Sequence, residues 1–181
     1  MNIIVYTDGS SLNNQHKGKR KGGIGVFFGD NDIRNKSIPL IESLDNKVTN
    51  QVAELTACLT ALELVCIEKL VLPKPDFDDV SFPPKKINII ICTDSQYSIN
   101  SISVWAKTWK KNNWKKKDGK IIENLELIKK IHNIYIDPLY NIKFKHIKAH
   151  TNKPPMSDPS YNDWYGNMMA DKLATDASHQ I

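Results

Sequence analysis

Apolar runs that end abruptly in acidic residues are the clearest pattern along the chain. Residues 3–6 are β-branched or aromatic, and Thr-Asp-Gly-Ser follows at residues 7–10. Such a run predicts a buried strand that ends in a turn. The design is repeated later, because the apolar stretch 87–92 leads into Thr-Asp-Ser at residues 93–95. We therefore expect two strands that each place a carboxylate at their carboxyl end.

The segment between these two strands predicts further strands and one long helix. Residues 22–29 form an apolar run with glycines at its ends, and residues 33–40 alternate imperfectly, with Pro39 suited to an edge strand. Short turns between these strands predict an antiparallel meander. Residues 52–67 are apolar on nearly every face, which predicts a largely buried helix capped at residue 49 or 50.

The connection from strand through helix to strand should make the two acid-terminated strands parallel neighbours. Asp8 and Asp94 would then converge at one edge of the sheet, where carboxylate oxygens can hold a divalent cation. Each acidic residue alone has another interpretation. An Asp after a strand is commonly a turn residue or a helix N-cap. Glu54 and Asp171, placed in the first turns of predicted helices, also suit the helix dipole.

The rest of the chain alternates predicted elements with polar loops. A short helix, an amphipathic helix, a strand and a last helix are predicted at residues 96–104, 122–136, 140–147 and from 166 onward. Two proline-containing polar stretches, 73–86 and 151–165, are predicted to be loop extensions, the second of them mobile. These elements fit one domain over residues 1–181.

Composition narrows the class of protein. With 181 residues, 40% apolar and 25% charged, the chain should fold around its own core, and its net charge of +5 mildly favours a polyanionic partner. Three cysteines without a Cys-x-x-Cys spacing argue against a disulfide framework and a zinc site. We expect buried thiols, no signal peptide and no transmembrane segment, and hence an intracellular location, cytoplasmic or nuclear.

Residues 105–120 concentrate the positive charge beside aromatic rings. They contain three of the four tryptophans and seven lysines. A run of charge is commonly a solvated face, but such faces rarely carry tryptophan. Lysines that neutralise phosphates, interleaved with flat aromatic rings, are typical of nucleic-acid grooves. The segment is therefore predicted to contact nucleic acid.

Taken in order, these motifs resemble ribonuclease H, type 1, over essentially the whole chain. The shared motifs are Thr7-Asp8-Gly9-Ser10, Thr49-Asn50-Gln51-(x2)-Glu54, Thr93-Asp94-Ser95, the Trp/Lys segment 105–120, Lys148-Ala149-His150-Thr151 and Gly166-Asn167-(x3)-Asp171. The resemblance implies an α/β fold of the ribonuclease H type. Its five-stranded mixed sheet has three antiparallel and two parallel strands, flanked by helices.

The resemblance also implies an endonuclease that hydrolyses the RNA strand of RNA–DNA hybrids and leaves 5′-phosphate and 3′-hydroxyl ends. Asp8, Glu54, Asp94 and Asp171 match the family's four metal-binding carboxylates. They would hold two Mg²⁺ ions, with Mn²⁺ as a substitute, one activating water and one stabilising the leaving 3′ oxygen. His150 matches the loop histidine that helps deprotonate water or release product.

Substrate contacts follow from the same resemblance. Asn14, Asn50 and Gln51 match residues that read the RNA strand, where amides can pair with 2′-hydroxyls. Thr49 and Asn124 match a pocket for a DNA-strand phosphate. The remaining matches are Lys47, at a position where relatives often carry Arg, the aromatic channel of Tyr97, Trp105 and Trp109, and Trp114 in the basic protrusion.

Two departures and three rivals accompany this interpretation. The loop from His150 to Gly166 is longer than the family usually has, and the proline-rich stretch 73–86 is also an extension. We expect that the separate hybrid-binding module of many family members is absent. We expect a free-standing monomer of modest processivity. The rivals are a DNA-cleaving nuclease of the same fold, a catalytically silent nucleic-acid-binding module, and the ribonuclease H part of a reverse transcriptase.

Overall fold

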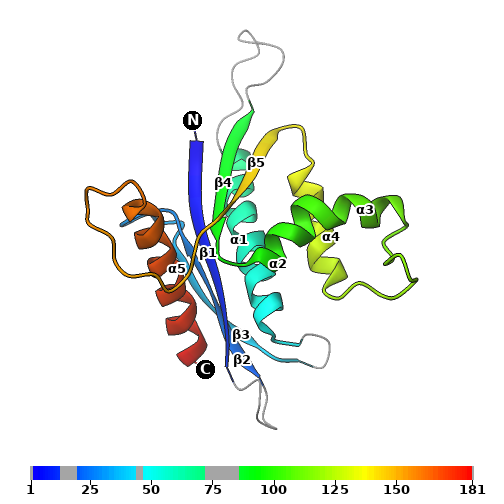
Figure 1. The fold of residues 1–181 in the computed structure, drawn as a ribbon, viewed down its shortest axis with the longest axis horizontal. Coiled ribbons are helices and arrows are strands. Elements are labelled where there is room, and N and C mark those ends of the chain that lie inside the picture. The colour runs from blue at the N-terminus through cyan, green and yellow to red at the C-terminus, as the bar shows by residue number, and fades with distance from the viewer. Residues whose placement is uncertain (1, 13–19, 44–46, 72–85, 181) are drawn as a thin grey trace.

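A five-stranded mixed sheet forms the centre of the molecule in the computed structural model, which describes residues 2–12, 20–43, 47–71 and 86–180 (Figure 1). The strands are β1 (Asn2–Leu12), β2 (Lys21–Phe27), β3 (Lys36–Ile41), β4 (Ile87–Thr93) and β5 (Tyr140–His146). Their order across the sheet is β3-β2-β1-β4-β5, with β3, β2 and β1 antiparallel and β1, β4 and β5 parallel. The predicted sheet and its directions are confirmed.

The register of β1 and β4 brings the two predicted strands side by side, with Tyr6 opposite Cys92, two residues before Asp8 and Asp94 respectively. The predicted end of the first strand at Asp8 is wrong, because β1 continues to Leu12 through its pairing with β2, whereas Asp94 directly follows β4. The two carboxylates nevertheless lie together where the pairing of β1 with β4 stops, as the parallel arrangement predicted. The central position of β1 also lets helices approach this edge from both faces.

Helix α1 (Asn50–Val71) covers one face of the sheet. The backbone oxygen and hydroxyl of Thr49 accept hydrogen bonds from the amides of Ala53 and Val52, at 2.9 and 3.2 Å, so Thr49 caps the helix. Glu54 is the fifth helical residue, and the first turn contains no acidic residue. The helix-dipole interpretation of Glu54 is therefore wrong, because its carboxylate lies beyond the first turn.

A close approach between α1 and β1 sets the position of Glu54. A Cβ atom added to Gly9 would overlap the backbone of Glu54 and Ala53. Only a residue without a side chain allows this spacing. Gly9 therefore lets the start of α1 approach β1 closely, next to Asp8.

Helix α5 (Tyr161–His179) covers the opposite face and crosses β2 where Gly25 leaves room for the helix backbone at Ala170. It begins at Tyr161, so the predicted loop 151–165 is wrong over its last five residues. Asp171 consequently lies in the middle of α5, and its helix-dipole interpretation is wrong too. Tertiary contacts rather than the local pattern decide where this helix begins.

The helices beside α1 extend further than the sequence pattern indicated. Helix α2 (Gln96–Ile99) continues through a π-helical stretch (Asn100–Trp105) into α3 (Ala106–Lys111), so the helix predicted to end at residue 104 runs seven residues longer. Helix α4 (Leu125–Tyr135) packs against α1 and buries Ile128 and Ile131, which confirms the predicted apolar stripe. Helix α3 and the turn after it extend away from the sheet (Figure 1).

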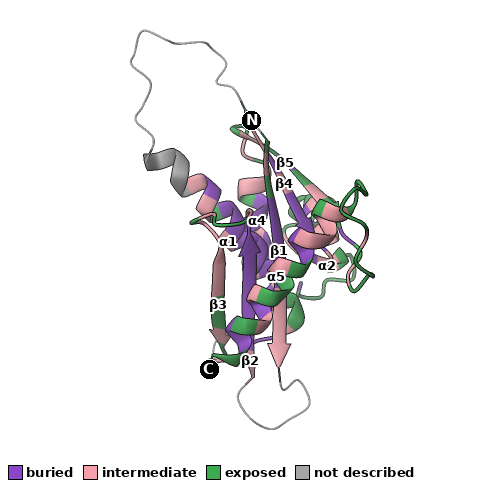
Figure 2. Cartoon of the chain, turned by 90° about the vertical axis from the view of Figure 1, so that its left-hand side faces the viewer, coloured by how far each residue is buried: buried purple, intermediate pink, exposed green. Residues whose placement is uncertain are grey.

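Burial follows the layers of the fold (Figure 2). The core between sheet and helices includes Val5, Leu55 and Ile91, none of which is exposed. Cys58 and Cys92 are buried, Cys66 is half-buried, and all three are free thiols, as expected. Among the described residues, no helix is long and apolar enough to cross a membrane. Residues 73–85 of the predicted extension 73–86 lie outside the described residues.

Candidate metal-dependent active site

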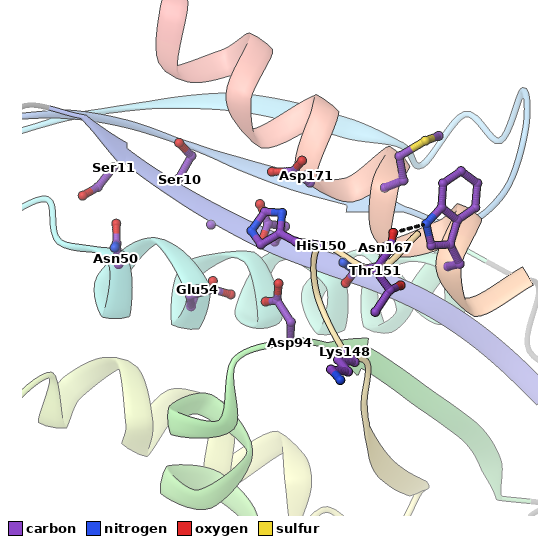
Figure 3. A pocket seen from close by; sticks show the side chains of 14 residues that line it. Ser10, Ser11, Asn50, Glu54, Asp94, Lys148, His150, Thr151, Asn167 and Asp171 are labelled. Atoms are coloured by element: carbon purple, nitrogen blue, oxygen red, sulfur yellow. Dashed lines mark hydrogen bonds between the residues drawn. The ribbon is translucent and has the colours of Figure 1, made fainter. Parts of the chain in front are cut away.

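Three carboxylates converge where the pairing between β1 and β4 stops. Asp8, Glu54 and Asp94 each offer one oxygen within 4.8 Å of the others. Asp171 of α5 lines the same pocket, a hollow of about 490 Å³, from the opposite side (Figure 3). Each covering helix thus contributes one carboxylate, while Asp8 comes from within β1 and Asp94 from the turn after β4. Asp171 lies outside the closely spaced group of three.

Local capping leaves the carboxylate of Asp94 free to face this pocket. Ser95, not Asp94, is the N-cap of α2, because its hydroxyl accepts a hydrogen bond from the amide of Ser98 at 3.2 Å. The Thr93 hydroxyl in turn accepts one from the amide of Ser95 at 3.1 Å. The N-cap interpretation of Asp94 is therefore wrong.

Crowding and burial change the acidity of the cluster. Burial, together with the charges of Asp94 and Asp171, raises the pKa of Asp8 to about 7. Burial and the same kind of repulsion from Asp8 and Asp94 raise the pKa of Glu54 to about 9. Burial also raises the pKa of Asp94, although the nearby His150 opposes the effect. The group is costly to ionise without a compensating positive charge.

The donor atoms in the pocket fit a hard divalent cation. Glu54 Oε2 and Asn167 Oδ1 are both buried and accept no hydrogen bond within the described part of the chain. Both belong to residues that line the pocket. Clustered carboxylate oxygens with an additional unpaired oxygen acceptor are the ligands that Mg²⁺ and Mn²⁺ prefer. Asp8, Glu54, Asp94 and Asp171 could hold such ions.

His150 reaches the pocket from the turn that follows β5. Its backbone has φ of 51°, in the left-handed region that non-glycine residues seldom adopt. Its side chain is drawn between Asp94 and Asp171 in Figure 3. Lys148 and Thr151 line the same pocket. The histidine predicted from the sequence thus lies beside the carboxylates.

Two of the three residues predicted to read the RNA strand, Asn50 and Gln51, lie at the start of α1. Asn50 lines the pocket at the end away from His150, near Ser10 and Ser11 (Figure 3). Gln51 is exposed at the next position of the helix. Asn14 lies outside the described residues.

Asn124, which was predicted to belong to a phosphate pocket, forms two side-chain hydrogen bonds. This residue has φ of 58°, and its side-chain amide donates to Tyr97 Oη at 3.2 Å and to Gln51 Oε1 at 3.5 Å. Thr49, the other residue predicted for the phosphate pocket, caps α1. Lys47 is exposed two residues earlier. The bonds join α1, α2 and the start of α4 into one surface.

Tyr97, Trp105 and Trp109 form an aromatic row. The row leads from this surface onto the protrusion, which consists of α3 and the turn after it. The rings of Tyr97 and Trp105 lie 6.2 Å apart, and those of Trp105 and Trp109 lie 5.6 Å apart. Trp105 is 39% exposed, whereas Trp109 is half-buried against the core. Trp114 packs edge-on against the buried His132 at 5.9 Å, so its ring anchors the protrusion to α4.

Several residues that line the pocket were not among the predicted site residues. They are Gly9, Ser10, Ser11, Lys148, Thr151, Trp164, Asn167 and Met168. Trp164 was missed because it fell in a stretch interpreted as a mobile loop. The one signal available was a tryptophan in an otherwise polar segment, which is unusual for a solvated loop.

Comparison with known proteins gives one consistent family. The RNase H family model matches residues 1–179. Ribonuclease H of Schizosaccharomyces pombe is 34% identical over 171 residues, which is 94% of this chain and 51% of that protein. The probable ribonuclease H of Acanthamoeba polyphaga mimivirus is 32% identical over 157 residues, 87% of this chain and 58% of that protein. The chain thus spans little more than half the length of these relatives.

Solved structures show the same fold. LC9-RNase H1, a type 1 RNase H with the type 2 active-site motif, aligns with a TM-score of 0.65 at 22% identity, covering 99% of this chain and 72% of that one. LC11-RNase H1 in complex with an RNA/DNA hybrid aligns with a TM-score of 0.55 at 20% identity, covering 98% and 97%. At these identities the likeness establishes the arrangement of strands and helices.

Proposed function

The chain belongs to the RNase H family, and we propose that it hydrolyses the RNA strand of RNA–DNA hybrids. The observation that carries this proposal is the group of Asp8, Glu54 and Asp94 within 4.8 Å. A protein of the same fold has been solved with an RNA/DNA hybrid bound, which supports the choice of substrate. The expected products carry 5′-phosphate and 3′-hydroxyl ends.

The four carboxylates are proposed to hold two divalent cations, Mg²⁺ or Mn²⁺. When bound, such ions supply a more acidic water molecule and positive charge beside the leaving oxygen. The protein's contribution is to keep Asp8, Glu54, Asp94 and Asp171 in place, on β1, on α1, in the turn after β4 and on α5 respectively. The raised pKa values of Asp8 and Glu54 support this role, because positive charge would relieve their repulsion.

His150 is proposed to accept a proton at a ring nitrogen or to assist release of the product. Its place between Asp94 and Asp171 supports this role. Its position in a turn, rather than within a strand or helix, leaves its side chain exposed. An exposed imidazole can exchange its proton with solvent between turnovers.

Recognition of the hybrid is proposed to use two surfaces, the start of α1 and the aromatic row. Asn50, which lines the pocket, and the exposed Gln51 beside it offer amide groups that can donate to and accept from the 2′-hydroxyls of an RNA strand. The row of Tyr97, Trp105 and Trp109 offers flat apolar rings that suit the deoxyribose strand, which lacks that hydroxyl. Lysines on the protrusion would neutralise phosphates.

The deciding experiment is a cleavage assay with end-labelled RNA. The RNA is presented annealed to DNA, annealed to RNA, or single-stranded, with Mg²⁺ or with chelator. We expect cutting of RNA only in the hybrid and only with metal. Asp94→Asn should lower the rate at least about 100-fold, because it removes a ligand charge while preserving shape.

Three outcomes of this assay would contradict the proposal in different ways. Cutting of a DNA duplex would favour a DNA-cleaving nuclease of the same fold. Tight hybrid binding without cutting would favour a silent binding module. Undiminished cleavage by the Asp94→Asn variant would contradict the assignment of the carboxylates to the active site. The hybrid affinity of the same variant is the control for folding.

A further inference from the structure

The loop after His150 is attached to helix α5 by a tryptophan. The indole Nε1–H of Trp164 donates a hydrogen bond to the backbone oxygen of Thr151 at 3.1 Å, drawn as a dashed line in Figure 3. Thr151 directly follows His150, and Trp164 is the fourth residue of α5. The bond therefore ties the chain to a helix one residue beyond the histidine.

A second contact holds the same loop to the same helical turn. The ammonium group of Lys153 lies 5.9 Å from the ring centroid of Trp164 and 6.0 Å from that of Tyr161. The two rings are themselves 5.9 Å apart, inclined at 41°. A cation at this distance from two aromatic faces is attracted to both. Thr151 and Lys153 thus both contact the first turn of α5.

The far end of the loop is fixed as well. The Asp158 carboxylate accepts hydrogen bonds from the amide and hydroxyl of Ser160, at 2.8 and 2.7 Å. The amide of Tyr161 donates to the Asp158 backbone oxygen at 3.0 Å, which leads directly into α5. The loop is therefore held at both ends.

The start of α5 rests on the sheet, so it is a firm support. The Tyr165 hydroxyl donates to Asp30 at 2.8 Å in the turn after β2. Asp163 forms an ion pair with Lys145 of β5 and accepts a weaker hydrogen bond from Tyr6 of β1. These contacts join the first turn of α5 to three strands or their turns.

His150 needs such support because of its backbone conformation. A non-glycine residue with φ of 51° persists only where its surroundings hold it. Without the bond to Thr151, the turn is free to relax and carry the imidazole away from Asp94. The attachment point lies one residue away, close enough to transmit any displacement.

We propose that Trp164, supported by Tyr161 and Lys153, is a positioning residue that holds His150 over the carboxylate pocket. This inference rests on the proposed hybrid cleavage, in which His150 acts beside the carboxylates. Trp164 acts through the backbone of the loop rather than on the reacting atoms. The long loop thereby becomes an ordered support for the histidine.

Trp164→Phe is the sharpest test, because it keeps an aromatic ring beside Lys153 and removes the N–H donor. We expect kcat for hybrid cleavage to fall about tenfold with KM within about twofold, as for other residues that orient a reacting group. In the Trp164→Phe variant, His150→Ala should lower kcat much less than it does in the unaltered protein, because both changes disable the same imidazole. Additive losses in the double variant would overturn the proposal.

The matched control is Tyr165→Phe, which removes a hydrogen bond from the neighbouring position of the same helix. Its partner is Asp30, not the His150 loop, so kcat and KM should stay within about twofold of the unaltered protein. An equal loss of kcat in both variants would contradict a specific role for Trp164. It would indicate general destabilisation of α5 instead.

A readout that needs no activity separates this inference from the proposed function. Amide hydrogen exchange of residues 150–157 in metal-free protein should be faster in Trp164→Phe and unchanged in Tyr165→Phe. Faster exchange in Trp164→Phe, together with no cleavage of hybrids by the unaltered protein, would support the attachment and contradict the proposed function. Unchanged exchange would overturn the attachment even if hybrid cleavage is confirmed.

Discussion

Two carboxyl groups buried side by side make the stability of this protein depend on pH. Folding raises the pKa of Asp8 to about 7 and that of Glu54 to about 9. In the unfolded chain these groups titrate near about 3.9 and 4.3. The stabilisation they contribute is complete below the unfolded values and is lost as the pH rises through the folded values.

For metal-free protein we therefore expect the free energy of unfolding to fall as the pH rises from about 7 to about 9. Glu54→Gln should flatten this decline and stabilise the protein at the alkaline end. Denaturant unfolding in chelator measures the effect. The range lies above about 6.5, the ordinary pKa of histidine, because burial lowers the pKa of His132 and its opposing contribution acts only below that value.

Glu63→Gln is the control, since it removes an exposed carboxyl group from the same helix. Its unfolding free energy should follow the pH dependence of the unaltered protein. Added Mg²⁺ should stabilise the protein more at high pH than at low pH, because metal ligation favours ionised carboxylates. A stability that rises with pH in chelator would contradict the raised pKa values.

At the scale of elements, the approach of α1 to β1 at Gly9 sets the spacing of the site. Gly9→Ala would push the helix backbone at Ala53 and Glu54 away from the strand. We expect a loss of about 1–3 kcal/mol in unfolding free energy, as for other overpacked sites. We also expect a fall in kcat for hybrid cleavage, because Glu54 moves relative to Asp8.

The matched control is Gly29→Ala. Gly29 has φ of 146° and open space around it, so alanine is strained there without touching the site. This variant should lose stability but keep its kcat, as measured by unfolding and steady-state cleavage in parallel. Equal kcat losses in the two glycine variants would show that stability alone, and not the position of Glu54, explains the effect.

Across the whole molecule, the carboxylate pocket and the aromatic row occupy different parts of the structure. No residue from 97 to 124 lines the pocket as described, and α3 extends away from the sheet. Binding of a long hybrid and cleavage of one phosphodiester bond should therefore respond to different substitutions. Under the proposed function, KM and kcat for hybrid cleavage measure this separation.

Trp105→Ala should raise KM for the hybrid about tenfold and leave kcat nearly unchanged, given a stacking contribution of about 1–3 kcal/mol per base. Trp105 is the better probe because it is 39% exposed, whereas Trp109 also packs on the core. Steady-state kinetics on one hybrid substrate measures both constants. A fall in kcat with constant KM would contradict a binding role for the row.

The sequence by itself determined the number of strands, their directions and the acidic residues that follow the two apolar runs. These features are encoded locally, because an apolar run followed by Thr-Asp is recognised without a distant partner, although only β4 ends there and β1 continues to Leu12. The helical connection through α1 then predicted that β1 and β4 are parallel neighbours. The positions of Asp8 and Asp94 at one edge followed from these two points.

Only the tertiary structure decided which carboxylates come close and what holds His150. The spacing of Asp8, Glu54 and Asp94 depends on Gly9 allowing α1 to approach, a contact between separate elements. Helix α5 begins at Tyr161, and contacts of its first residues with distant strands and turns hold it on the sheet. Since such contacts join residues far apart in the chain, no local pattern of apolar and polar residues could reveal them.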